Sequence, residues 1–204
     1  MPELGLFPLA IVLLPTERVP LHIFEPRYRE LIEECLHEGK EFGISYTDGE
    51  GAVAEVGTRA MVVEVLERLE DGRVNVIAEG RERFRLLELT RGREFQTGSV
   101  EEIVDDGAAA EPEAVERAFV PFPRLAEIAG APVDEPAPGP ALSFALGARV
   151  DFGLEPKQKL LESTSEPERL ELVSELLEKA AETLATQHEL QNRASSNGRV
   201  HPSE

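Results

Sequence analysis

Prolines recur every five to seven residues between Pro8 and Pro26, and this spacing constrains the fold more than any other feature of the chain. Each proline lacks a backbone N–H and favours extended geometry in the residue before it. The intervening residues are mostly apolar, as in the runs LFPLAIVLLP and VPLHIF. A long helix is therefore excluded, and short strands separated by turns are predicted over residues 4–24.

A helix is predicted directly after this segment. Pro26 suits the first helical position, where its missing N–H would have no partner. Apolar residues then recur at the spacing of one helix face, namely Tyr28, Leu31, Ile32, Cys35 and Leu36. Gly39 is placed to end the helix. Cys35 is the single cysteine, so an internal disulfide is excluded and a buried thiol is expected.

The rest of the first half of the sequence is predicted to form strands. Apolar or alternating runs cover residues 42–46, 61–66, 74–78, 83–89 and 94–104, and Asp71-Gly72 is a hairpin signal between two of them. These runs predict a mostly antiparallel sheet that coils into a partial barrel and leaves few edges exposed.

The pattern changes from a period of two to a helical period near Asp106. We therefore expect a β-rich subdomain over residues 1–106, a helical subdomain over 107–192 and a polar, disordered tail over 193–204. Helices are predicted over 112–130 with an interruption at Pro121 and Pro123, and over 142–154, 156–161 and 167–190. Residues 131–140 hold four prolines and are predicted to form a loop.

Two motifs resemble a known family. The run Leu6-Phe7-Pro8-Leu9 and the later Phe24-Glu25-Pro26-Arg27-Tyr28-Arg29 are similar to the amino-terminal, substrate-binding domain of Lon (La) ATP-dependent proteases. The run Lys157-Gln158-Lys159-Leu160-Leu161-Glu162, followed by Arg169-Leu170, resembles the helical part of that domain. The resemblance covers residues 4–190, and the proline-rich stretch 121–140 departs from it.

The resemblance implies an α+β fold. We expect an amino-terminal coiled, antiparallel, PUA-like pseudo-barrel with one inserted helix, followed by a carboxy-terminal helical bundle. It also implies a non-catalytic module that holds unfolded polypeptide or a protein partner in a groove between the two parts. Two alternatives stay open, a PUA-like module that senses a small ligand or RNA, and a peptidase. A homodimer is also left open.

The enzyme modules of a complete Lon protease are not expected here. The sequence holds no G-x-x-x-x-G-K-[ST] phosphate loop. Ser163, Ser165 and Ser174 lie near Lys159 and Lys179, but in a charged helical region without the strand and turn that would present a nucleophile. We therefore predict a stand-alone substrate-binding module with no catalytic residues and no cofactor.

The net charge and the spacing of the histidines exclude further classes of ligand. The 40 acidic and 21 basic residues give a net charge of -19, which repels nucleic acid. The four histidines lack the spacing of a zinc site, so no metal is expected. No apolar run is long enough for a membrane span and no signal-like segment opens the chain, so a cytoplasmic location is expected.

Four residues near the predicted start of the first helix are the candidates for peptide binding or for the junction between subdomains: His22, Phe24, Arg27 and Tyr28. Arginine is suited to binding carboxylates, and histidine can respond to pH, although a hydrogen-bonded structural role is favoured for His22.

Other charged clusters are expected to be ordinary surface. Arg81, Arg83 and Arg85 alternate along one predicted strand, which places them on a single face that we expect to be solvated. The pairs Glu101-Glu102 and Asp105-Asp106 are expected to be exposed charges at strand ends or in loops.

Overall fold

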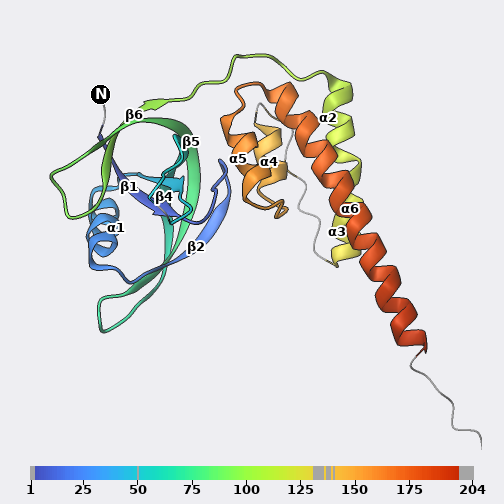
Figure 1. Ribbon diagram of the computed structural model, residues 1–204, viewed down its shortest axis with the longest axis horizontal. Coiled ribbons are helices and arrows are strands. Elements are labelled where there is room, and N and C mark those ends of the chain that lie inside the picture. The colour runs from blue at the N-terminus through green and yellow to red at the C-terminus, as the bar shows by residue number, and fades with distance from the viewer. Residues whose placement is uncertain (1–2, 50, 131–135, 137–138, 140, 198–204) are drawn as a thin grey trace, which may run out of the picture.

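The computed structural model describes the 204-residue chain except for residues 1–2, 50, 131–135, 137–138, 140 and 198–204. A β-rich part and a helical part lie side by side (Figure 1). The expected α+β class is confirmed, with a ring-like sheet that contains one inserted helix and is followed by the carboxy-terminal helices.

Six strands make up the sheet: β1 (Glu3–Leu9), β2 (Arg18–Ile23), β3 (Phe42–Tyr46), β4 (Val56–Arg68), β5 (Val74–Thr90) and β6 (Thr97–Glu102). Their order is β2-β5-β4-β3-β1-β6, and an additional pairing of β5 with β6 closes the ring. The pairings are antiparallel except that of β1 with β3, which is parallel. Strand β2 occupies the end of this order and pairs with β5 along one edge.

The sequence divides β5 into two runs, whereas the structure contains one strand of 17 residues. Gly80 lies at the division and supports the continuous path. A Cβ atom there would come within 2.2 Å of the Leu14 carbonyl oxygen, so only glycine lets the loop of residues 10–17 cross β5 this closely. The crossing is fixed by hydrogen bonds, since Thr16 N–H donates to Gly80 and Gly80 N–H donates to Glu17, both at 2.9 Å.

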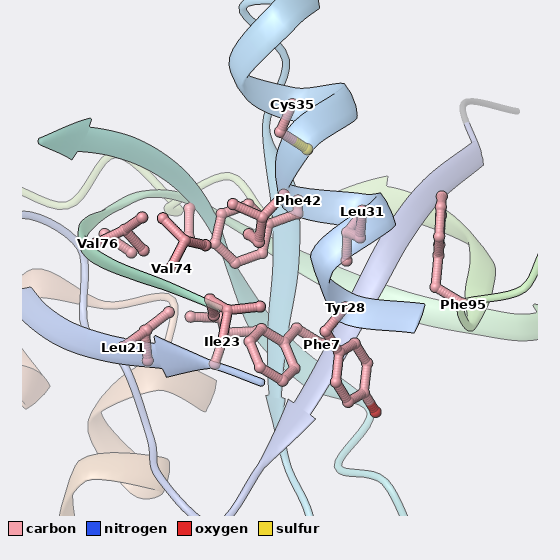
Figure 2. Close-up of a cluster of buried hydrophobic side chains, with 14 of the residues drawn as sticks. Phe7, Leu21, Ile23, Tyr28, Leu31, Cys35, Phe42, Val74, Val76 and Phe95 are labelled. Carbon is pink, nitrogen blue, oxygen red and sulfur yellow. The ribbon is translucent and has the colours of Figure 1, made fainter. Parts of the chain in front are cut away.

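The predicted first helix is confirmed as α1 (Pro26–Glu38). Pro26 opens it, and Gly39 ends it in the left-handed conformation with φ 65°. Its apolar face packs into the barrel core with side chains from β1, β2, β3 and β5 (Figure 2). Cys35 is buried there, and this burial raises the pKa of its thiol to about 11.

Five further helices follow: α2 (Pro112–Phe119), α3 (Pro121–Ala129), α4 (Leu142–Gly147), α5 (Leu154–Glu162) and α6 (Glu166–Asn197). The helix predicted over 112–130 is two helices, because Pro121 begins a new one after Val120. The helix predicted over 142–154 stops at Gly147, and a turn follows in which the Asp151 carboxylate accepts the Gly153 N–H at 2.9 Å.

Two predicted segments fall largely outside the described residues. Of the loop at 131–140, only positions 136 and 139 are described. Residues 198–204 of the predicted tail are likewise outside, whereas residues 193–197 belong to α6. No helix in the described part of the chain is long and apolar enough to cross a membrane.

A second core joins the two parts of the molecule. Side chains of α6 pack against α2, α3 and α4, as the side-by-side ribbons of Figure 1 indicate. The same core includes Val12, Leu14 and Val56 from the β-rich part. The helices are therefore held on the loop of residues 10–17 by a shared apolar cluster.

Tyr28 and Phe24 should respond differently to truncation. Tyr28 is buried, with its ring centroid 4.1 Å from that of Phe7, whereas Phe24 is 59% exposed. We expect Tyr28→Ala to lower the free energy of unfolding by about 3–5 kcal/mol, and Phe24→Ala to change it by about 0.5 kcal/mol or less. Urea denaturation followed by circular dichroism measures both. Equal losses would contradict this assignment of Phe24 to the surface.

Candidate functional site

One buried guanidinium connects the helical and β-rich parts of the molecule. Arg169, on α6, is fully buried and donates two hydrogen bonds to Asp105, from Nη1 to Oδ1 at 2.9 Å and from Nη2 to Oδ2 at 2.5 Å. Asp105 belongs to the segment between β6 and α2, and it also pairs with Arg83 of β5. Arg83 donates in addition to the carbonyl oxygens of Leu161 at 2.8 Å and Ser163 at 2.6 Å.

A second acid completes this cluster, which we call the latch (Arg83, Asp105, Ser143, Glu166 and Arg169). The Glu166 carboxylate accepts from Arg169 at 2.7 Å and from the Ser143 hydroxyl at 2.6 Å. The Phe144 ring lies against both guanidiniums, at 4.4 Å from Arg169 and 5.2 Å from Arg83.

The two arginines respond oppositely to their surroundings. Burial lowers the pKa of Arg83, and its attraction to Asp105 only partly offsets this. Burial also opposes the charge of Arg169, but the hydrogen bonds that it donates to Asp105 and Glu166 outweigh this and raise the pKa of that guanidinium. Both remain cations, since an arginine keeps its charge in proteins.

The latch corrects two expectations drawn from the sequence. Arg83 is only 4% exposed, so it does not lie on a solvated face, although Arg81 and Arg85 are partly exposed. Asp105 was expected to be an exposed charge in a loop, but its carboxylate forms ion pairs with two arginines. The helices that approach from the second half of the chain bury this part of β5.

Two hollows flank the loop of residues 10–17 at the junction. One, of about 430 Å³, has apolar walls from both subdomains, including Ile11, Val19, Val150 and Leu154. Lys157 closes part of its rim by an ion pair with Glu17 at 2.5 Å. The other, of about 440 Å³, has Phe144 and Val104 among its walls and is otherwise rich in charged side chains of β5.

A third hollow, of about 500 Å³, lies on the outer face of β2 and its neighbours. We call it the outer-face hollow, and its walls are Pro20, Leu21, His22, Leu66, Glu67 and Asn75. A row of hydrogen bonds crosses three strands there, since His22 Nδ1 donates to Asn75 Oδ1 at 2.6 Å and Asn75 Nδ2 donates to Glu67 at 3.0 Å. The exposed Phe24 ring stacks on His22 with 5.9 Å between centroids.

The structure separates the four candidate residues. His22 and Phe24 lie together beside the outer-face hollow, where His22 is hydrogen-bonded as favoured from the sequence. Tyr28 is a core residue. Arg27 is surface-exposed, with its guanidinium 4.5 Å from the Tyr28 ring centre and paired with Glu25 at 2.7 Å.

Sequence reasoning missed the contribution of β4 to this surface. Leu66 is 52% exposed and Val65 is also exposed, although both belong to a strand. Register shifts between Val62 and Glu64 and between Val65 and Glu67 disturb the alternation of faces. The two adjacent apolar residues Val65 and Leu66 break the strict alternation of apolar and polar residues, and they were the sequence signal for this irregularity in β4.

Within the described residues, no group of three acids, histidines or cysteines lies close enough together to hold a metal ion.

Comparison with known proteins identifies a family. Residues 3–179 match the family model described as the ATP-dependent protease La (LON) substrate-binding domain. The chain is 27% identical over 192 residues to a Lon protease of Anaeromyxobacter dehalogenans and 23% identical over 200 residues to Lon protease 1 of Hydrogenovibrio crunogenus. These alignments cover 85% and 90% of this chain but 22% and 24% of the relatives, so the chain spans about a quarter of their length.

Solved structures agree with this match. A Lon N-terminal domain protein from Xanthomonas campestris is 26% identical, with a TM-score of 0.66 over 84% of this chain and 96% of that one. The N-terminal domain of the Mycobacterium avium complex Lon protease is 17% identical and shares the fold, with a TM-score of 0.63 over 87% of this chain and 98% of that one.

Removal of the shared carboxylate should destabilise the latch. In Asp105→Asn, the buried Arg83 and Arg169 lose their common counter-ion, and we expect the free energy of unfolding to fall by about 3 kcal/mol. The neighbouring Asp106→Asn is the control. Asp106 is exposed and its side chain accepts the nearby Ala108 N–H, so we expect a change of about 0.5 kcal/mol or less. Chemical denaturation of both variants measures the difference, and equal stability would rule out the latch as a structural determinant.

Proposed function

The chain belongs to the ATP-dependent protease La (LON) substrate-binding domain family, and on that basis we propose that it recognises polypeptide segments without acting on them chemically. We further propose that recognition takes place at the outer-face hollow and the Phe24 ring beside it. The observation that carries this choice is the exposure of Phe24 and Leu66 next to a hollow, in a fold whose other large aromatic side chains are mostly buried.

The apolar character of this surface supports polypeptide as the ligand. Peptide-binding sites combine apolar pockets with a few polar groups that fix orientation. The outer-face hollow has Pro20 and Leu66 among its walls for apolar contact, and Asn75 for hydrogen bonding. Aromatic side chains such as Phe24 provide large contact areas at low cost in conformational entropy.

Strand β2 sets the path that we propose for the bound chain. Val19 borders the apolar junction hollow and the next residue, Pro20, borders the outer-face hollow, so the two hollows adjoin one strand. Consecutive side chains of a strand point to opposite faces, so an extended segment that runs along the outer face of β2 contacts Pro20 and the outer-face hollow. Pro20 has no N–H to offer a new neighbouring strand, so we assign the affinity mainly to side-chain contacts rather than to added sheet hydrogen bonds.

The charge of the chain argues against the RNA alternative. Phosphate backbones bind through the release of counter-ions by lysine and arginine, whereas this chain carries a net charge of -19. The peptidase alternative has no support in the sequence motifs.

Binding of unfolded polypeptide is the direct test of this function. We expect a fluorescently labelled, permanently unfolded polypeptide to bind saturably in the absence of nucleotide, with a rise in anisotropy, and a folded protein of similar charge not to bind. Failure of a varied set of unfolded chains to bind would contradict the proposal.

A matched pair of leucine substitutions locates the surface. Leu66→Ser places a hydroxyl at the outer-face hollow. Leu89→Ser makes the same change at a similarly exposed leucine, in the stretch of β5 that pairs with β6. We expect Leu66→Ser to weaken binding about tenfold, as the loss of a buried apolar contact would, and Leu89→Ser to leave it unchanged. Circular dichroism confirms that both variants are folded. Equal affinities for the two variants would exclude the outer-face hollow as the binding surface.

A further inference from the structure

We infer that the outer-face hollow selects a particular class of segment, namely apolar side chains flanked by lysine or arginine. This inference rests on the proposed function, because it specifies the sequence preference of the same surface. It is carried by the positions and partners of the charges around the hollow.

Two strand-to-strand rows form the outer face. In one row, His22 lies opposite Asn75, which lies opposite Glu67. In the other row, Pro20 lies opposite Ile77, which lies opposite Glu64. Directly opposed residues of antiparallel strands point to the same face, so each row runs from β2 across β5 to an acid on β4. The β2 side of the surface thus carries Pro20 and His22, and the β4 side carries Glu64 and Glu67 together with the exposed Leu66.

The two acids of β4 are not neutralised. Glu64 and Glu67 are both exposed, and within the described part of the chain neither forms an ion pair with a lysine or an arginine. The Glu67 carboxylate accepts a hydrogen bond from the neutral Asn75 amide at 3.0 Å. Glu67 lines the outer-face hollow together with Leu66, and Glu64 lies two positions before Leu66 on the same strand.

The arginines around the hollow are, in contrast, already paired. Arg18 at the start of β2 bonds to Glu79 at 2.7 Å, and Arg68 at the end of β4 is paired with Glu33. Arg27 is paired with Glu25. The unbalanced charge at this surface is therefore negative, in the same direction as the net charge of -19.

The consequence for a ligand follows from electrostatics. A lysine or arginine next to the apolar segment gains from Glu64 and Glu67, whereas an acidic residue in the same place is repelled. Exposed charge pairs of this kind contribute modestly and are screened by salt, so the preference should appear as a selectivity at low ionic strength rather than as the main source of affinity.

Two labelled peptides with the same apolar core test the inference, one flanked by lysines and the other by glutamates. We expect the lysine-flanked peptide to bind the wild-type protein at least about fivefold more tightly at low salt, and the ratio to shrink at 0.5 M salt. In the double variant Glu64→Gln/Glu67→Gln, we expect the ratio of the two affinities at low salt to fall toward one.

The control is Glu178→Gln/Glu182→Gln, which changes the net charge equally at two exposed positions of α6. We expect this control variant to keep the preference for the lysine-flanked peptide. If it loses that preference as much as Glu64→Gln/Glu67→Gln does, the inference is overturned, because the effect then comes from the net charge of the protein. Equal binding of the two peptides by the wild-type protein would also overturn it, while leaving the proposed function intact. Absence of binding by both peptides and by unfolded polypeptide would overturn the proposed function and this inference together.

Discussion

The two-point contact between the Arg169 guanidinium and the Asp105 carboxylate determines how the two halves of this molecule meet. Asp105 lies at the point where the chain leaves the sheet, and Arg169 lies near the start of the longest helix. A fully buried guanidinium is costly unless its donors are satisfied, and here two acids, a hydroxyl and a carbonyl oxygen accept from it. The geometry of the latch therefore leaves few alternative positions for the helical subdomain.

This arrangement connects to the proposed recognition surface through the loop of residues 10–17. The helices pack on Val12 and Leu14 of that loop, and the loop is fixed to β5 by its hydrogen bonds across Gly80. Strand β2 follows directly and pairs with β5 alone among the described strands. Its inner residues are fixed in the barrel core, so His22 on its outer face and Phe24 directly after its end are held by a rigid strand. A preorganised surface of this kind loses little entropy when it binds a flexible chain.

The sequence predicted the local structure well where one physical signal dominated. The prolines and the apolar periodicity after Pro26 identified the short strands and α1, and the hairpin at Asp71-Gly72 followed from its turn residues. The family resemblance could also be recognised from the sequence, because it rests on short contiguous motifs. Helix ends between Leu142 and Leu154 were less well predicted, because a side-chain turn at Asp151 competes there with an apolar pattern that would allow a helix to continue.

Features that depend on distant parts of the chain were not predictable from patterns. Arg83 looks like a surface residue in its own strand, and it is buried where it donates to the carbonyl oxygens of Leu161 at the end of α5 and of Ser163, 78 and 80 positions later. Phe24 looks like a core aromatic in an apolar run, yet it is the first residue past the end of β2 and points to solvent. Leu66 joins His22 only because β4 and β2 pair with the same segment of β5.

Amide hydrogen exchange with and without an unfolded polypeptide is the measurement that shows whether polypeptide binds on the outer face of β2. If it does, we expect slower exchange on binding in residues 18–24 and 63–68, with little change in α2 and α3. Protection confined to the helical subdomain, with unchanged exchange in β2 and β4, would contradict it.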